Sequence, residues 1–209
     1  MPLAEILTKK FPQIKSISMN CNPQKTNVIL GNTTETLWGK DTITDTMCGN
    51  AVDLSPESFY QVNTLQAEHL YETAKDFAQL TGKERLLDLY CGAGTIGLSM
   101  ADAVQELIGV EIVPEAVENA KKNAARSGVQ NARFFCGDAG QIANKLAQQG
   151  TTPDIIVVDP PRKGCDATAI QAIVQMQPER MVMISCNATT AARDCAALEQ
   201  LGYVARQVQ

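Results

Sequence analysis

From residue 64 onward, short apolar runs alternate with segments of helical periodicity, and this alternation constrains the fold more than any other feature of the chain. The apolar runs lie at residues 85–90, 106–112, 132–138, 154–161 and 180–187. The helical segments lie at residues 63–80, 92–101, 114–128, 139–149, 167–176 and 189–202. The alternation predicts parallel strands covered by helices on both faces and joined by right-handed crossovers. We therefore expect a doubly wound, Rossmann-like α/β sheet, in which residues 203–209 begin a sixth strand.

The residues before this pattern have a different character. Between residues 14 and 62, short β-branched runs are separated by Asn, Thr and Gly, as is typical of hairpins, and residues 27–32 (NVILGN) form one such run. We predict a small β-hairpin-rich appendage at residues 1–62 and an α/β unit at residues 63–209. In the first helix of that unit, one side is expected to be buried, and it carries Leu65, Leu70, Ala74, Phe77 and Leu80.

Composition and charge narrow the classes of function. The seven cysteines include no CxxC pair, so neither a zinc ribbon nor an iron–sulfur motif is visible, and we predict no metal site. No apolar run approaches the roughly 18–20 residues that span a bilayer, and the start does not read as a secretory signal. We therefore expect a reducing, cytoplasmic location. A net charge of −5 argues against a chain that coats nucleic acid unaided, but it leaves room for a local basic site.

The ends of the predicted strands carry residues that suit a nucleoside cofactor. In a doubly wound sheet, ligands bind beyond the carboxyl ends of the strands. The first strand is followed by Gly92, Gly94 and Gly97, which fit GxGxxG and let the backbone approach a ligand. The second strand ends at Glu111, which we expect to hold ribose hydroxyls. The third ends at Asp138, which we expect to accept a hydrogen bond from an adenine amino group.

GxGxxG also occurs in nicotinamide-dependent oxidoreductases, so the discrimination depends on the surrounding residues. Asp88 lies just before the glycines, where its carboxylate would repel a pyrophosphate but could face the methionine ammonium of S-adenosylmethionine. The fourth strand ends in the loop Asp159-Pro160-Pro161-Arg162, which has no evident role in hydride transfer. The sequence therefore favours an S-adenosylmethionine-dependent methyltransferase.

Cys186 is the candidate nucleophile, because it follows the fifth strand at the same sheet edge as Asp159. The start of the next helix and the cations Arg162, Lys163 and Arg193 would favour its thiolate form. A thiolate that adds to C6 of uracil turns C5 into a carbon nucleophile that can accept a methyl group. The loop also lacks the aromatic residue of the NPPY-like loops that methylate exocyclic amines, since Arg162 stands in its place.

Four motifs together resemble the RNA uracil-5-methyltransferase family, which makes 5-methyluridine in ribosomal and transfer RNA. They are SFYQVN (58–63), DLYCGAGTIG (88–97), DPPRKG (159–164) and SCNATTAARD (185–194). The resemblance implies a class I methyltransferase sheet and an RNA substrate, ribosomal in preference to transfer RNA. It makes Cys186 the nucleophile, and the cations of the strand-four loop and the last helix are expected to meet the RNA. The residues expected to contact the cofactor or shape its pocket are Gln61, Asp88, Tyr90, Gly92, Gly94, Thr95, Glu111, Asp138 and Asp159.

The sequence departs from the family pattern in three respects. Ala188 replaces the proline of the usual SCNP motif, which removes a backbone constraint but no chemical group. The family's proton-abstracting glutamate and its amino-terminal RNA-binding barrel, with the cysteine cluster that often accompanies the barrel, do not occur in the chain. We therefore expect the chain to be the central and catalytic portion of a longer protein, poorly active by itself.

Two other functions stay open. A cytosine-5 RNA methyltransferase shares the adduct chemistry, but it would show a different cysteine arrangement around the strand-four loop, and DPPRKG carries no cysteine before Cys165. A binding module that keeps the fold without catalysis is the other alternative. The presence of Cys186 and of the DPPR loop argues against it.

Overall fold

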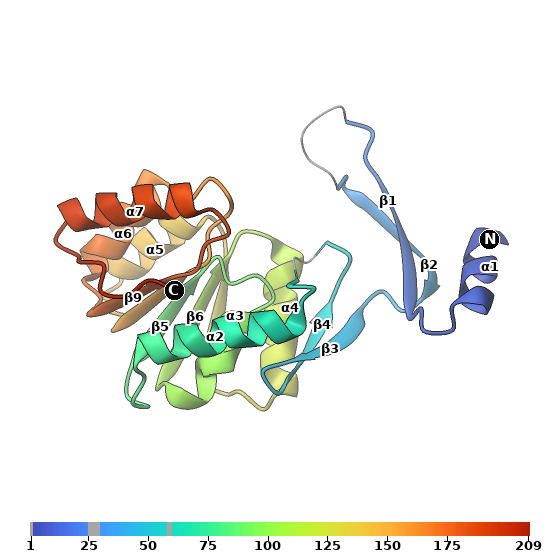
Figure 1. The fold of residues 1–209 in the computed structure, drawn as a ribbon, viewed down its shortest axis with the longest axis horizontal. Helices are drawn as coiled ribbons and strands as arrows, with labels where there is room; N and C mark the ends of the chain where they lie inside the picture. Colours follow the sequence, from blue (N-terminus) through green and yellow to red (C-terminus); the bar gives the residue numbers. More distant parts are fainter. Residues whose placement is uncertain (1, 25–29, 58–59) are drawn as a thin grey trace.

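The computed structural model describes residues 2–24, 30–57 and 60–209 of the chain. Its centre is a sheet of five parallel strands in the order β7-β6-β5-β8-β9 (Figure 1). These strands are β5 (Arg85–Leu89), β6 (Glu106–Glu111), β7 (Ala132–Cys136), β8 (Ile155–Val158) and β9 (Arg180–Met183). The doubly wound α/β fold is thereby confirmed, because each strand lies within an apolar run that predicted it.

Helices cover both faces of this sheet, as alternating strands and helices require (Figure 1). One face carries α2 (Thr64–Ala78), α3 (Thr95–Met100) and α4 (Pro114–Arg126), with a short 3-10 turn, η1 (Ala101–Ala103). The other face carries α5 (Ala139–Gln148), α6 (Ala167–Met176) and α7 (Ala188–Gln200). Side chains alternate along each strand, so Leu86 joins the first core and Leu87 the second.

The residues before α2 form a short helix and two antiparallel hairpins: α1 (Pro2–Lys10), β1 (Ser16–Cys21) with β2 (Thr33–Gly39), and β3 (Ile43–Met47) with β4 (Asn50–Leu54). The β1–β2 hairpin projects away from the sheet, whereas β3–β4 lies against α4 (Figure 1). Met47 and Val52 are buried in the core beneath α2. The sequence did not predict α1. Of the β-branched run predicted at residues 27–32, residues 27–29 lie outside the described part of the chain.

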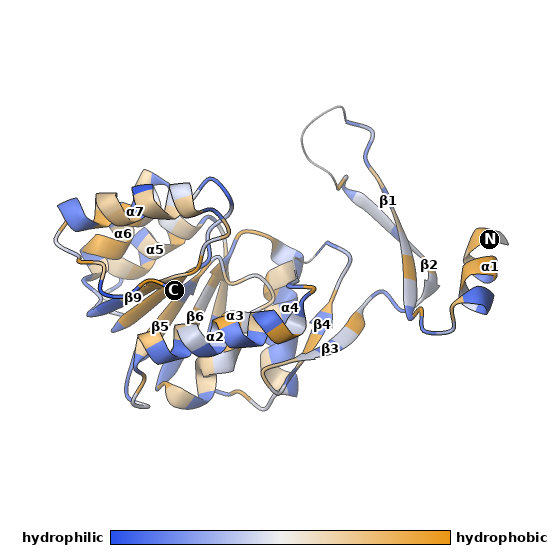
Figure 2. Cartoon of the chain, viewed as in Figure 1, coloured by the Kyte–Doolittle hydropathy of each residue, from blue (hydrophilic) through white to orange (hydrophobic). Residues whose placement is uncertain are grey.

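Figure 2 shows that hydrophobic residues concentrate in the strands and on the inward sides of the helices. In α2 the predicted inward side was only partly right: Ala74 is buried, and Phe77 and Leu80 pack against the core. The other buried residues are Ala67, Tyr71 and Ala78, which the sequence did not nominate. Leu65 and Leu70 are 73% and 39% exposed. The reason is steric: a face of three alanines lets the helix approach the sheet closely, and a face chosen by the largest apolar side chains would hold it away.

The sixth strand expected at residues 203–209 is absent from the described structure. Val204 and Val208 are 57% and 91% exposed. Tyr203 packs against the second core, and it is held by hydrogen bonds from its N–H to the Leu198 carbonyl at 3.1 Å and from its hydroxyl to the Pro178 carbonyl at 3.2 Å, neither of which belongs to a strand ladder. A strand needs a ladder partner for its backbone groups, which a run of suitable side chains does not supply. The only neighbour of β9 within the described residues is β8.

One buried side chain joins the β3–β4 hairpin to the glycine-rich loop after β5. Asn123 in α4 is 0% exposed. Its Oδ1 accepts from the backbone N–H of Asp53 at 2.8 Å, and its Nδ2 donates to the Ala93 carbonyl at 3.1 Å. The β3–β4 hairpin is therefore tied to the loop that begins α3. The predicted boundary between the appendage and the α/β unit, at residues 62 and 63, remains a prediction.

We expect Asn123→Ala to lower the free energy of unfolding by about 2–4 kcal/mol, since it removes two hydrogen bonds and leaves buried groups unpaired. Arg126→Ala is the matched control on the same helix. Its ion pair with Asp53 is partly exposed and should contribute less than about 1 kcal/mol. Urea denaturation of both variants measures the difference. Equal losses of unfolding free energy in the two variants would show that the buried Asn123 hydrogen bonds contribute no more than the exposed ion pair.

Candidate active site at the carboxyl edge of the sheet

The carboxyl ends of the five parallel strands meet at one edge of the sheet. Leu89 at the end of β5 is in register with Val110 in β6 and Val158 in β8. Glu111 in β6 is in register with Cys136 in β7. The loops that follow these strands therefore come together, and they contain almost all the residues that the sequence nominated for cofactor binding and attack.

Glu111 holds the start of the glycine-rich loop. Its Oε2 accepts from the backbone N–H of Gly92 at 3.0 Å. Its Oε1 accepts from the N–H groups of Ile112 and Val113 at 2.8 and 2.9 Å. Gly94 adopts φ +83° at the start of α3, a conformation that favours glycine. The carboxylate and the loop thus form one unit at the point where a nucleoside would lie.

Gly97 has a packing role. A Cβ at this position would lie 2.8 Å from Leu107 Cδ1 and 2.9 Å from Asp88 Oδ2. The absence of a side chain lets the first turn of α3 sit directly on β5 and β6. The backbone N–H of Gly97 can then donate to Asp88 Oδ2 at 2.9 Å.

We expect Gly97→Ala to destabilise the protein by about 1–3 kcal/mol through overpacking. Leu107→Ala provides the test of cause, because it removes the nearest clashing atoms. In the double variant the added cost of Gly97→Ala should fall by about 1 kcal/mol. Denaturant midpoints of the two single variants and the double variant measure this coupling. Strictly additive losses would contradict the packing explanation.

Asp88 is the most unusual group at this edge. Its side chain is 1% exposed, and its Oδ1 is buried without a hydrogen-bond partner among the described residues. Its pKa is raised to about 8, mainly by burial and to a smaller extent by the carboxylates of Asp159 and Glu111, against the lowering effect of the Gly97 hydrogen bond. A buried carboxylate with one unpartnered oxygen is suited to a cationic group that the chain itself does not supply.

Asp159, Tyr71 and Thr95 lie close to this carboxylate. Burial raises the pKa of half-buried Asp159 to about 6. The Tyr71 hydroxyl lies 3.3 Å from Thr95 Oγ1. Burial, with Asp159 and Asp88 as smaller causes, raises the pKa of Tyr71 to about 12. Tyr71 was not among the site residues predicted from the sequence, and the signal that indicates it is the spacing of the small residues that share its face of α2.

The remaining nominated residues have less direct positions. Tyr90 has a positive φ of +67°, and its ring packs against the second core. Burial there, with nearby Cys165 and Asp166, raises the pKa of its hydroxyl. Asp138 caps α5, where its Oδ1 accepts from the Gln141 N–H at 3.0 Å.

Gln61 is partly buried just before α2, while the first two residues of its motif, 58 and 59, lie outside the described residues. The cofactor contacts of Gln61, Tyr90 and Asp138 stay predictions.

Cys186 lies exposed in the turn between β9 and α7. Arg162 and Lys163 are exposed in the loop after β8. Because β8 and β9 are parallel neighbours, this loop and the turn that holds Cys186 lie at the same edge of the sheet. Arg193 is engaged with the protein: its Nη2 donates to the Lys163 carbonyl at 2.8 Å and its guanidinium pairs with buried Asp194. Contacts of these three cations with RNA stay predictions.

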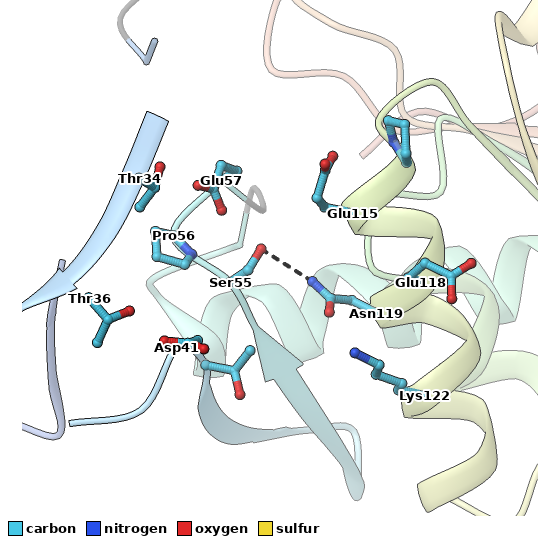
Figure 3. Close-up of a pocket in the computed structure, with 12 residues that line it drawn as sticks. Thr34, Thr36, Asp41, Ser55, Pro56, Glu57, Glu115, Glu118, Asn119 and Lys122 are labelled. Atoms are coloured by element: carbon cyan, nitrogen blue, oxygen red, sulfur yellow. Dashed lines mark hydrogen bonds between the residues drawn. The ribbon is translucent and has the colours of Figure 1, made fainter. Parts of the chain in front are cut away.

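A separate cleft of about 500 Å³ lies between β2 and α4 (Figure 3). Its charged lining consists of Asp41, Glu57, Glu115, Glu118 and Lys122. Four carboxylates against one ammonium disfavour a phosphate backbone, and none of the nominated site residues lines the cleft. The sheet edge is therefore the better candidate for the chemistry.

No helix among the described residues has the length and apolarity to cross a membrane. Within the same residues, no group of three or more His, Cys, Asp or Glu side chains is arranged to hold a metal ion.

The strand order, the glycine-rich loop and the buried acid before it define the class as S-adenosylmethionine-dependent methyltransferases with a Rossmann-like fold. Within that class the chain belongs to the tRNA (uracil-5-)-methyltransferase family, which matches residues 33–208.

Similar proteins agree with this assignment. An uncharacterised RNA methyltransferase of Halalkalibacterium halodurans is 47% identical over 207 residues, covering 99% of this chain and 45% of that protein. One from Oceanobacillus iheyensis is 45% identical over 203 residues, covering 97% and 44%. The chain thus spans less than half the length of these relatives.

Solved structures show the same likeness. The Pyrococcus abyssi tRNA (uracil-54, C5)-methyltransferase in complex with S-adenosyl-L-homocysteine superposes with a TM-score of 0.76 at 28% identity, covering 94% of this chain and 46% of that one. An Agrobacterium tumefaciens S-adenosylmethionine-dependent methyltransferase, with a TM-score of 0.60 and 18% identity over 85% of this chain and 61% of that one, supports the fold. Fold and family together indicate S-adenosylmethionine as the cofactor.

Proposed function

We propose that the protein transfers a methyl group from S-adenosylmethionine to C5 of a uridine in RNA, and that Cys186 forms a covalent bond to C6 during the reaction. The observation that carries this proposal is the exposure of Cys186 at the sheet edge that also holds Asp88 and Asp159. An accessible thiol next to a cofactor site is what an attack on C6 requires.

The residues at the edge fit S-adenosylmethionine. The unpartnered, buried Oδ1 of Asp88 suits the methionine ammonium, and Glu111 beside Gly92 suits the ribose hydroxyls. Asp138 is assigned to the adenine, and Thr95 to a further polar contact. When bound, the cofactor supplies an electrophilic methyl group on a sulfonium.

The chain's own chemistry begins at the thiol. The Cys186 thiolate forms an S–C6 bond, and the electron pair of the C5–C6 double bond moves into the enolate, which makes C5 nucleophilic. C5 would then take the methyl group, with the electron pair of the broken methyl–sulfur bond staying on the departing S-adenosylhomocysteine. A base must remove the remaining C5 proton, after which the S–C6 bond breaks and the thiolate is regenerated. Arg162 and Lys163 are assigned to the RNA, where exposed cations can pair with phosphates.

The substrate is assigned to ribosomal RNA in preference to transfer RNA on the resemblance of the motifs, and transfer RNA is the alternative outcome of the test. All seven cysteines are free in the structure, which suits the reducing cytoplasm. Residues 1–62 are assigned to the appendage and residues 63–209 to the methyltransferase unit.

Cytosine-5 methylation is the weaker candidate. It would be expected to show a different cysteine arrangement around the strand-four loop, and the cysteine that lies in that region is Cys165. Cys165 is 6% exposed, and burial with the nearby Asp194 carboxylate raises its pKa to about 12. Such a thiol is a poor nucleophile near neutral pH.

The test uses RNA containing 5-fluorouridine, S-adenosylmethionine and the protein as its gene encodes it, with any flanking sequence. Fluorine at C5 cannot leave as a proton does, so the covalent complex persists and is visible as a shifted band on a denaturing gel. We expect a complex with ribosomal RNA fragments that requires the cofactor. A complex with transfer RNA alone would change the substrate class, and 5-fluorocytidine RNA reacting in its place would contradict uracil methylation.

A further inference from the structure

One face of α7 holds the backbone of the loop that follows β8. Asn187, Thr190, Arg193 and Asp194 are spaced so that they lie on the same side of the helix. Asn187 is the capping residue, and Cys186 directly precedes it. The helix that begins beside the candidate nucleophile therefore also carries the side chains that hold the neighbouring loop.

Four hydrogen bonds to three residues of the loop define this contact. The Arg162 carbonyl accepts from Asn187 Nδ2 at 3.2 Å and from Thr190 Oγ1 at 3.2 Å. The Lys163 carbonyl accepts from Arg193 Nη2 at 2.8 Å. The Cys165 N–H donates to Asp194 Oδ2 at 2.7 Å. A four-residue segment of the loop is thus held at its first, second and fourth residues.

The intervening residue must be glycine. Gly164 has φ +81°, and a Cβ there would collide with Arg193 Nη2 and Asp194 Oδ2. Its N–H donates to the Pro161 carbonyl at 2.7 Å, which closes the turn. The packing of α7 on the loop therefore depends on backbone groups of the loop and on the lack of a side chain at Gly164. The exposed side chains of Arg162 and Lys163 are not part of these contacts.

Asp194 is the buried residue among the four that hold the loop. It is 1% exposed, yet both of its oxygens are partnered, Oδ2 by the Cys165 N–H and Oδ1 by Arg193 Nε at 2.9 Å and Nη2 at 2.6 Å. Asp88 has the opposite arrangement, since its Oδ1 lacks a partner. A buried carboxylate whose two oxygens are both partnered specifies one geometry and leaves no binding capacity for a ligand.

Asn187 joins the two halves of the site. Its Oδ1 accepts from the Thr189 N–H at 3.1 Å and so caps the helix, while its Nδ2 reaches the Arg162 carbonyl. Its own carbonyl and N–H both bond to Ser185 Oγ, at 3.1 and 3.2 Å, which fixes the turn that presents Cys186. One side chain therefore connects the nucleophile's turn to the loop that begins at Asp159.

We propose that Asn187, Thr190, Arg193 and Asp194 are positioning residues that set the placement of the loop after Asp159 against Cys186, with Asn187 as the direct link. The inference rests on the proposed function, because it concerns the attack of Cys186 on a uridine of the RNA to which that loop is assigned. It assigns to Arg193 a role in holding the loop, where the sequence suggested contact with RNA.

The test compares Asn187→Ser with the wild type in the 5-fluorouridine reaction. Serine keeps a neutral capping oxygen and loses only the amide donor to Arg162. We expect complex formation to slow by at least about tenfold, because a small displacement of a nucleophile is costly. The affinity for S-adenosylmethionine and the rate of Cys186 alkylation by iodoacetamide should stay within about twofold, since neither requires the loop to be placed.

Thr190 supplies a matched pair of variants. Thr190→Val removes the hydroxyl at almost constant volume and should slow complex formation, whereas Thr190→Ser retains the donor and should restore the wild-type rate. Unchanged rates in both Asn187→Ser and Thr190→Val, with a wild type that reacts, would overturn the positioning role. Parallel losses of alkylation and cofactor affinity would overturn it as well, because they indicate a general structural defect. Failure of the wild type to react would overturn the proposed function itself.

Discussion

The Cys186→Ala variant is expected to lose RNA methylation by about 10³-fold or more, since removing a covalent nucleophile deletes the step that activates C5. It should also give no stable complex with 5-fluorouridine RNA. Its fold should be intact, because Cys186 is exposed in a turn and packs in neither core. Transfer of labelled methyl groups from S-adenosylmethionine to RNA measures the loss.

Cys21→Ala is the matched control for this variant. Cys21 is also exposed, but it lies in the β1–β2 hairpin, away from the carboxyl edge of the sheet. We expect it to methylate RNA at the wild-type rate. Retention of more than a tenth of the activity by Cys186→Ala would mean that the thiol is not the nucleophile.

Asp88→Asn is expected to act in opposite directions on cofactor binding and on stability. The variant should bind S-adenosylmethionine about 100-fold more weakly, because a buried charge that would meet the ammonium is lost. The cofactor-free protein should become more stable by about 2–4 kcal/mol at pH 8, since an ionised, buried carboxylate with an unpartnered oxygen is costly and asparagine can still accept from Gly97.

The raised pKa of Asp88 determines how the stability difference between Asp88→Asn and the wild type changes with pH. The pKa of Asp88 is raised to about 8 in the folded protein from an ordinary value of 3.8. Between these two values the folded state binds the proton and the unfolded state does not, so stability from this group is present at low pH and is lost as the pH rises towards 8. The gain in stability of Asp88→Asn over the wild type should therefore grow from pH 4 to pH 8.

Thermal unfolding at several pH values and isothermal titration with the cofactor measure both effects. Asp102→Asn is the control, because Asp102 is exposed and pairs with Lys75 at the surface. It should change stability by less than about 0.5 kcal/mol and leave cofactor affinity unchanged. An Asp88→Asn protein that binds the cofactor normally would remove Asp88 from the ammonium site.

The sequence predicted the central sheet well because buried parallel strands leave a strong local signal. The run IIVV of β8 is wholly buried, and so are the apolar residues of β5 and β6 apart from their ends. Glu111, Asp138 and Asp159 could be placed at one edge because strand direction fixes where each strand ends. Topology alone brought those residues together.

The parts that could not be predicted depend on contacts between distant segments. The inward face of α2 is set by how closely a helix can approach a sheet, which favoured Ala67 and Ala78 over Leu65. Asn123 and Asp194 are polar residues in helices, and only the packed structure shows that each is buried against the backbone of a loop. The stretch at residues 203–209 has strand-like side chains, but a strand also needs a partner.

Mass spectrometry of the trapped 5-fluorouridine complex is the most direct test of the central claim, that Cys186 attacks the uridine while S-adenosylmethionine supplies the methyl group. After nuclease and protease digestion, we expect one modified peptide, containing Cys186, whose added mass corresponds to a methylated 5-fluorouridine nucleotide. A modification on any other residue, or a complex that carries no methyl group although S-adenosylmethionine is present, would contradict the claim.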